Sequence, residues 1–134
     1  MKNKTAFIIM HDPPRVTAQQ RKVAIDREGR PHFYAPERLK AAQNIYLNDV
    51  WPYRPKKPYE GPIKLTVSFS FSTDDKKKWG MPKTTRPDTD NMIKALKDVL
   101  TAAGFWKDDS QVYCETVNKI WAAAGRIRVI IEEW

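Results

Sequence analysis

Hydrophobic and polar residues alternate most regularly in the segment IKLTVSFSFS, residues 63 to 72. The apolar positions are Ile63, Leu65, Val67, Phe69 and Phe71, and lysine, threonine and serine occupy the positions between them. A period of two places alternate side chains on opposite faces of a β-strand. The pattern therefore predicts a strand with one buried face and one face in contact with water.

A helical period replaces this alternation in the segment DTDNMIKALKDVLTAAG, residues 88 to 104. Its apolar residues fall on one stripe: Met92, Ile93, Leu96, Val99, Leu100 and Ala103. Asp88 follows a proline and fits an N-cap, and Gly104 fits a C-terminal stop. An earlier helix is predicted from Pro36 through PERLKAAQNIYLNDVW, which is rich in helix-forming residues.

Shorter patterns complete the chain. Extended segments are predicted for TAFIIM (residues 5–10) and on both sides of the turn REGRP, and four prolines between residues 51 and 62 predict an extended connector. The segments QVYCETVNKIWA (111–122) and RIRVIIEEW (126–134) are predicted as two final strands that pair in a hairpin. The expected fold is α/β of the mixed α+β type: one small domain over residues 1–134, with a mixed sheet, two main helices and a C-terminal hairpin.

Composition supports a folded chain that works inside the cell. The 134 residues are 41% hydrophobic and 11% aromatic, and the lone Cys114 cannot form an intramolecular disulfide. No apolar stretch approaches the roughly 20 residues of a membrane span, and the apolar run near the start is too short for a signal peptide. We expect a cytoplasmic protein that does not associate with membranes.

The charge balance indicates a polyanionic partner. The net charge is +8, with +6 on residues 1–60 and +2 on residues 61–134, so the acids gather in the second half. The triplet Lys76, Lys77 and Lys78 beside Trp79 is one candidate DNA-binding group; a second comprises Arg15, Arg21, Lys22, Arg27 and Arg30. Such groups contact phosphates without reading sequence. A simple solvated loop is the alternative for the lysine triplet.

Two pairs of acids flank the second predicted helix. Asp88 and Asp90 lie at its start, where acids are favourable by about 0.3 to 1 kcal/mol each, and Asp90 has the spacing to pair with Lys94. Helix stabilisation alone is therefore one interpretation. It leaves the second pair of acids, Asp108 and Asp109, unexplained. If the strand that follows them runs back past the helix, Asp109 comes level with Asp88 and Asp90. Three carboxylates in one place repel each other, so one of them would hold a proton unless a cation lay between them.

Oxygen ligands of this kind favour Mg²⁺ or Mn²⁺. Such an ion polarises a phosphodiester and activates a water, while Lys94 would stabilise charge that develops on the phosphate. The residues thus predict a metal site formed by Asp88, Asp90 and Asp109, with Lys94 as a further catalytic group.

The segment RPDTDNMIKALKDVLTAAGFWKDDSQV, residues 86 to 112, resembles the signature of the RusA family of Holliday-junction resolvases from bacteria and their prophages. The similarity rests on Pro87-Asp88-x-Asp90-Asn91, on Lys94 and on the DDSQ segment at residues 108–111, and it extends more loosely through most of the chain. It implies a small mixed α/β homodimer that cuts branched DNA with Mg²⁺ or Mn²⁺. It also implies that Asp88, Asp90, Asp109 and Lys94 are the essential residues.

Two other functions stay open on the sequence. If the acids only stabilise the helix, the chain would be a branched-DNA-binding module without cleavage. If they do bind metal, a flap or a replication fork is an alternative target, because the acids define the reaction and not the shape of the DNA.

Overall fold

The computed structural model describes residues 2–15, 22–25, 27–28, 31–34 and 37–134. The strands are β1 (Asn3–Ile9), β2 (Lys22–Ile25), β3 (Pro31–Tyr34), β4 (Ile63–Ser72), β5 (Val112–Ala122) and β6 (Arg126–Glu133). The helices are α1 (Glu37–Val50) and α2 (Thr89–Ala103), with short 3-10 turns η2 (Trp51–Tyr53), η3 (Lys76–Lys78) and η4 (Asp109–Gln111). The predicted mixed α+β architecture is confirmed, and both main helices form where the sequence places them.

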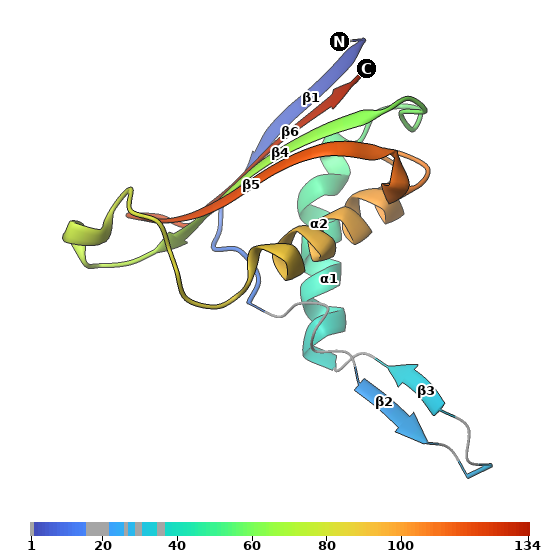
Figure 1. Cartoon of the computed structure of the whole chain (residues 1–134), viewed down its shortest axis with the longest axis horizontal. Helices are drawn as coiled ribbons and strands as arrows, with labels where there is room; N and C mark the ends of the chain where they lie inside the picture. Colours follow the sequence, from blue (N-terminus) through green and yellow to red (C-terminus); the bar gives the residue numbers. More distant parts are fainter. Residues whose placement is uncertain (1, 16–21, 26, 29–30, 35–36) are drawn as a thin grey trace.

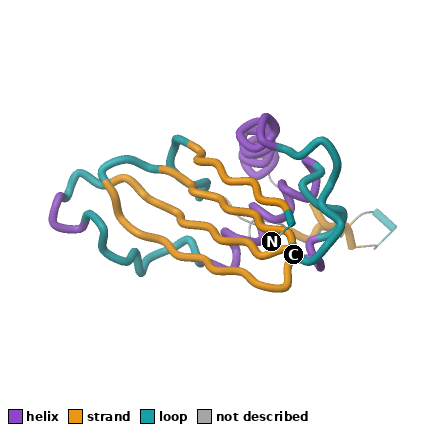
Figure 2. The backbone as a smooth tube through the Cα atoms, turned by 90° about the horizontal axis from the view of Figure 1, so that it is seen from above, coloured by secondary structure: helices purple, strands orange, loops and turns teal. Residues whose placement is uncertain are grey.

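The main sheet has the strand order β1-β6-β4-β5, and both helices cover one of its faces (Figure 1). Strand β4 is parallel to β5 and antiparallel to β6, while β1 is antiparallel to β6. Helix α2 is the crossover between the parallel strands, as such a connection requires. Figure 2 looks onto the face of the sheet that the helices leave open and shows both termini near one end of the strands.

The last two strands differ from the predicted hairpin. They follow one another along the chain and run antiparallel, but β4 lies between them and receives the hydrogen bonds of both. The link of residues 123–125 must therefore cross two strand spacings, about 10 Å, and three residues are long enough for that. Strand β4 buries five apolar residues on its inner face. Its position between β6 and β5 covers both of its edges with neighbouring strands.

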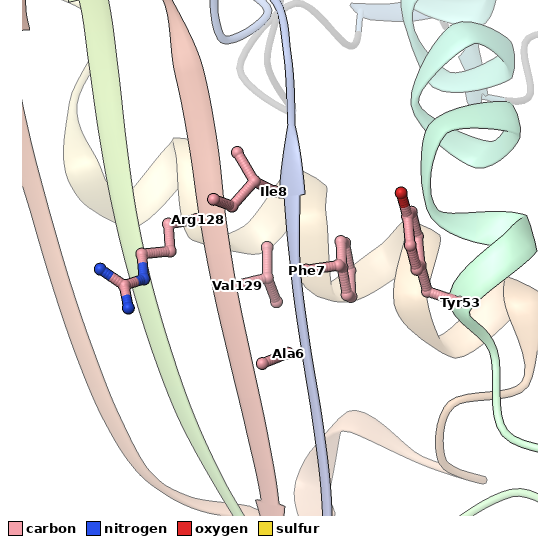
Figure 3. Close-up of a pocket in the computed structure, with 6 residues that line it drawn as sticks. All are labelled: Ala6, Phe7, Ile8, Tyr53, Arg128 and Val129. Atoms are coloured by element: carbon pink, nitrogen blue, oxygen red, sulfur yellow. The ribbon is translucent and has the colours of Figure 1, made fainter.

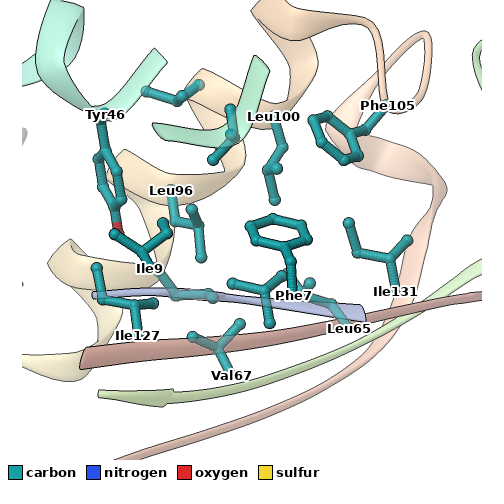
Figure 4. Packing of buried hydrophobic residues seen from close by; sticks show 14 of the residues in the cluster. Phe7, Ile9, Tyr46, Leu65, Val67, Leu96, Leu100, Phe105, Ile127 and Ile131 are labelled. Carbon is teal, nitrogen blue, oxygen red and sulfur yellow. The ribbon is translucent and has the colours of Figure 1, made fainter. Parts of the chain in front are cut away.

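The core lies between the inner face of the sheet and the helices (Figure 4). Every apolar residue of the alternating β4 segment is buried, and so are all six residues of the predicted α2 stripe. Phe105 and Trp106, directly after α2, are also fully buried, and the Trp106 indole N–H donates to Thr101 Oγ1 at 2.7 Å. The two predicted periodicities thus meet in one core.

No helix in the described part of the chain has both the length and the apolarity that crossing a bilayer requires.

Gly125, in the link before β6, lies against Asp12. A side-chain carbon at this glycine would come within 2.5 Å of Asp12 Cα, and Asp12 is itself fixed because its carboxylate accepts from Ser72 N and Oγ. We expect Gly125→Ala to lower the free energy of unfolding by about 1–3 kcal/mol through this overlap. Thermal unfolding would measure the loss, with Ala124→Ser at the exposed neighbouring position as control. Equal melting temperatures for Gly125→Ala and wild type would contradict the contact.

Candidate active site

Asp88 is the N-cap residue of α2. Its backbone is extended (φ −76°, ψ 145°) and its carbonyl oxygen accepts the first helical hydrogen bond, from Met92 N at 3.0 Å. Its side chain makes no capping hydrogen bond. An aspartate at this position ordinarily uses its carboxylate to cap the helix, so the Asp88 carboxylate is left available for another partner.

Asp90 and Asn91 occupy the first turn of α2. One carboxylate oxygen of Asp90 accepts from Asn91 N at 3.0 Å, and Asp90 lines an open hollow of about 280 Å³ together with Glu115 and Val117 of β5. The side-chain nitrogen of Asn91 is buried without a hydrogen-bond partner in the described structure. An unpaired buried donor costs about 1–3 kcal/mol, so the start of α2 carries a polar group that the described structure leaves unsatisfied.

Asp109 lies in the loop between α2 and β5, and its neighbours hold that loop in shape. Asp108 and Gln111 form a capping box around η4, and Gln111 also donates to the carbonyl oxygens of Tyr59 and Gly61 at 2.8 and 3.1 Å. Hydrogen bonds from Ser110 lower the pKa of Asp108 below its ordinary value. The carboxylate of Asp108 therefore serves the loop, whereas Asp109 is the acid that faces α2.

Lys94 connects α2 with this loop. Its ammonium lies 2.8 Å from Asp98 Oδ1 and 4.0 Å from Asp109 Oδ2. The sequence suggested a pair with Asp90 one turn earlier, but the ammonium turns toward the C-terminal end of the helix instead. The structure thus brings together Lys94 and Asp109, which are 15 positions apart in the chain.

Strand β5 does run back past α2, as the metal interpretation required. The β5 residues nearest the start of the helix are Glu115, Val117 and Lys119, whereas Asp109 precedes the strand. A strand rises about 3.3 Å per residue and a helix about 1.5 Å, so a few strand residues span the whole distance from the start of α2 to its middle. Asp109 therefore lies beside the middle of α2, near Lys94, and not level with Asp88 and Asp90. Within the described residues, no group of three or more His, Cys, Asp or Glu side chains is close enough together to hold a metal ion.

The donor chemistry of these residues nevertheless fits a hard divalent ion. Asp88, Asp90 and Asp109 offer only oxygen donors on exposed or half-exposed side chains, and the Asp88 carboxylate is not used by the helix cap. Oxygen donors of this kind are the ligands of Mg²⁺ and Mn²⁺.

The predicted DNA-binding groups lie at different places. The triplet Lys76 to Lys78 forms the exposed turn η3, where the ammonium of Lys76 is 6.0 Å from the centre of the Trp79 ring. The guanidinium of Arg15 lies 5.0 Å above the Phe71 ring. Of the remaining residues, Arg21 and Arg30 lie outside the described residues, Lys22 is described only as a backbone position in β2, and Arg27 is in an exposed turn.

A second hollow, of about 440 Å³, lies beside the edge strand β1 (Figure 3). The rings of Phe7 and Tyr53 stack there at 4.7 Å, and Arg128 lies on the other side of the strand. Among the residues that the structure describes, its lining includes no carboxylate. The chemistry of phosphodiester cleavage therefore points to the start of α2 and away from this hollow.

Two lysines to which the sequence assigned no role bond the chain just before Asp88. Lys83 is buried and donates to the carbonyl oxygens of Thr85 and Arg86, and Lys119 donates to those of Thr85 and Pro87. Neither residue carries a sequence signal, because the contacts depend on how β5 packs against the loop.

Comparison with known proteins identifies the family to which this chain belongs. The family model described as "Endodeoxyribonuclease RusA" matches residues 13–132. This chain belongs to the RusA endodeoxyribonuclease family.

Two of three similar proteins carry the RusA name. The chain is 34% identical over 120 residues to "Crossover junction endodeoxyribonuclease rusA" of Lactococcus phage r1t, an alignment that covers 87% of this chain and 89% of the phage protein. It is 32% identical over 138 residues to "Uncharacterized protein YqaN" of Bacillus subtilis (strain 168), covering 95% and 94%. A shorter match, 46% over 54 residues, relates it to "Crossover junction endodeoxyribonuclease RusA" of Escherichia coli (strain K12), covering 40% and 45%.

Proposed function

We propose that this RusA-family chain is a divalent-metal-dependent endodeoxyribonuclease that resolves four-way DNA junctions by hydrolysing phosphodiesters. Family membership supports the nuclease activity, and the names of the phage and Escherichia coli relatives support the crossover junction as substrate. The observation that carries the metal is the Asp88 carboxylate, which occupies an N-cap position without capping the helix.

In this proposal Asp88, Asp90 and Asp109 would together hold Mg²⁺ or Mn²⁺, which requires the ion to draw Asp109 from its place beside Lys94 toward the start of α2. The ion supplies Lewis-acid activation of the phosphate and of the attacking water. Lys94 contributes a positive charge beside Asp109 that stabilises the negative charge developing on the phosphate.

Exposed lysines of η3 would hold the DNA through its phosphates. Neutralising Lys76, Lys77 and Lys78 together by glutamine is expected to weaken junction binding and to reduce the slope of log affinity against log salt by up to about 3, because each phosphate contact contributes roughly 0.9. Binding titrations between 50 and 200 mM salt, in conditions without cleavage, would measure this slope.

The matched control neutralises Lys2, Lys56 and Lys57, which line a hollow near the opposite end of β4. We expect this variant to keep the wild-type slope. If both triple variants reduce the slope of log affinity against log salt by the same amount, η3 has no special role and the whole basic surface attracts DNA.

A homodimer suits the proposed substrate. Resolution of a four-way junction needs two cuts, and a two-fold assembly supplies two equivalent sites. Several large apolar side chains are exposed and available to an interface, among them Trp51, Trp134 and Met10. Sedimentation analysis of the protein alone and bound to a junction would show whether two chains act together.

The test of the function uses wild-type protein and an end-labelled four-way junction, with a flap, a replication fork and a linear duplex as competing substrates. Paired nicks in the junction with Mg²⁺ or Mn²⁺, and none with EDTA, are the expected result. Preferential cutting of the flap or fork would redirect the substrate assignment. Binding of the junction without any product under either metal would instead support a binding module.

A further inference from the structure

Lys83 is a buried cation with an unusual set of partners. Only 3% of its surface is exposed, and its ammonium donates to the carbonyl oxygens of Thr85 at 3.1 Å and Arg86 at 2.6 Å. The rings of Phe71 and Trp121 flank it at 5.0 and 4.8 Å. A buried charge requires such compensation because desolvation is costly.

Lys119 completes the arrangement from β5. Its ammonium donates to the carbonyl oxygens of Thr85 and Pro87, the latter at 2.7 Å, and its own carbonyl accepts from Lys83 N at 3.0 Å. The carbonyls of three successive residues, 85 to 87, are therefore each bonded to an ammonium group. The next residue in the chain is Asp88.

Placing two ammonium groups here is energetically unfavourable for a loop that only connects β4 with α2. Both ammonium groups share the Thr85 carbonyl, so two like charges lie close together, and burial together with Lys119 and Arg15 lowers the pKa of Lys83. Within the described residues both groups bond main-chain and hydroxyl oxygens, with no carboxylate partner to offset the repulsion.

We propose that Lys83 and Lys119 are positioning residues that fix the main chain of residues 85–87 and thereby set the direction of the Asp88 carboxylate. The inference rests on the proposed function, in which Asp88 is a metal ligand. Since the Asp88 side chain is not fixed by a capping hydrogen bond, the main chain before it sets the position and the Cα–Cβ direction from which the carboxylate extends. Ligand geometry of this kind depends on the residues that support it.

The decisive test measures binding of Mn²⁺ alone, in the absence of DNA, by electron paramagnetic resonance of the free ion. Removal of a positive charge by itself would strengthen cation binding. We expect the opposite for Lys119→Met and Lys83→Met, namely a 10- to 100-fold weaker affinity, the range found when residues that support metal ligands are replaced. We also expect kcat for junction cleavage to fall by a similar factor, while KM changes less than about two-fold.

The control is Lys64→Met, which removes a half-buried lysine from the opposite face of the same sheet and should keep wild-type Mn²⁺ affinity. Lys119→Arg retains the charge and should recover part of the lost affinity. If Lys83→Met does not fold, the half-buried Lys119 decides the question by itself. Mn²⁺ affinity equal to or tighter than wild type in Lys119→Met overturns the inference.

The outcomes separate this inference from the proposed function. Wild-type cleavage that is lost in Asp88→Asn but unchanged in both lysine variants would leave the nuclease standing and remove the positioning role. Failure of the wild-type protein to cut any branched DNA with Mg²⁺ or Mn²⁺ would remove both.

Discussion

Replacement of Asp90 by asparagine is expected to lower metal-dependent junction cleavage by more than about 100-fold while junction binding persists. Losses of this size follow removal of a single group that stabilises the transition state. Asparagine keeps the shape and the accepting oxygen that bonds Asn91 N, so the start of α2 should remain folded. The measurement is cleavage of an end-labelled junction with Mg²⁺ or Mn²⁺, beside a binding titration in EDTA.

Glu115→Gln is the matched control for Asp90→Asn. Glu115 lines the same hollow, but its carboxylate is already engaged by Lys97 at 2.9 Å. We expect its cleavage rate to stay within a few-fold of wild type. If Asp90→Asn cuts as fast as wild type, Asp90 only stabilises the first turn of α2 and the metal assignment is wrong.

Lys94→Met is expected to reduce the cleavage rate by about 100- to 1,000-fold, again with little loss of junction binding. The methionine retains an unbranched apolar side chain of good helix propensity, so the change removes the charge and leaves α2 intact. The physical reason for the rate loss is that a fixed positive charge beside Asp109 no longer opposes the negative charge that builds up on the phosphate. Single-turnover cleavage separates this effect from binding.

Asp98→Asn distinguishes catalysis from helix stabilisation. In the structure the shorter ion pair of Lys94 is the one with Asp98, at 2.8 Å, and such an i,i+4 pair on a helix surface is worth about 0.3–0.5 kcal/mol. If Lys94 acted only through that pair, Asp98→Asn would reproduce the loss seen in Lys94→Met. We expect it instead to cut at nearly the wild-type rate.

The sequence predicted those parts of the fold that depend on local periodicity. The period of two in β4 and the apolar stripe of α2 each identify the buried face directly, because the same residues that repeat in sequence end on one side of the element. The cap residues Asp88 and Gly104 likewise marked both ends of α2. The resemblance in residues 86–112 also identified the family that the whole-chain comparison shows.

Pairing between strands was decided by the tertiary structure. Consecutive strands joined by a short link predict a hairpin, yet β4 takes the place between β5 and β6. The choice depends on which strand loses most by leaving the centre, and an inner face of five buried apolar residues favours β4. The local sequence pattern cannot predict this strand order, because the order depends on contacts between segments that are far apart in the chain.

The candidate site divides in the same way. Sequence determined which acids flank α2, since spacing and residue type are local properties. Only the folded chain decided that Lys94 turns toward Asp98 and Asp109, and that Lys83 and Lys119 bond the three carbonyls before Asp88. The physical reason is that a charged side chain takes the partner that packing brings within reach, and that partner is set by how β5 and its preceding loop lie against the helix.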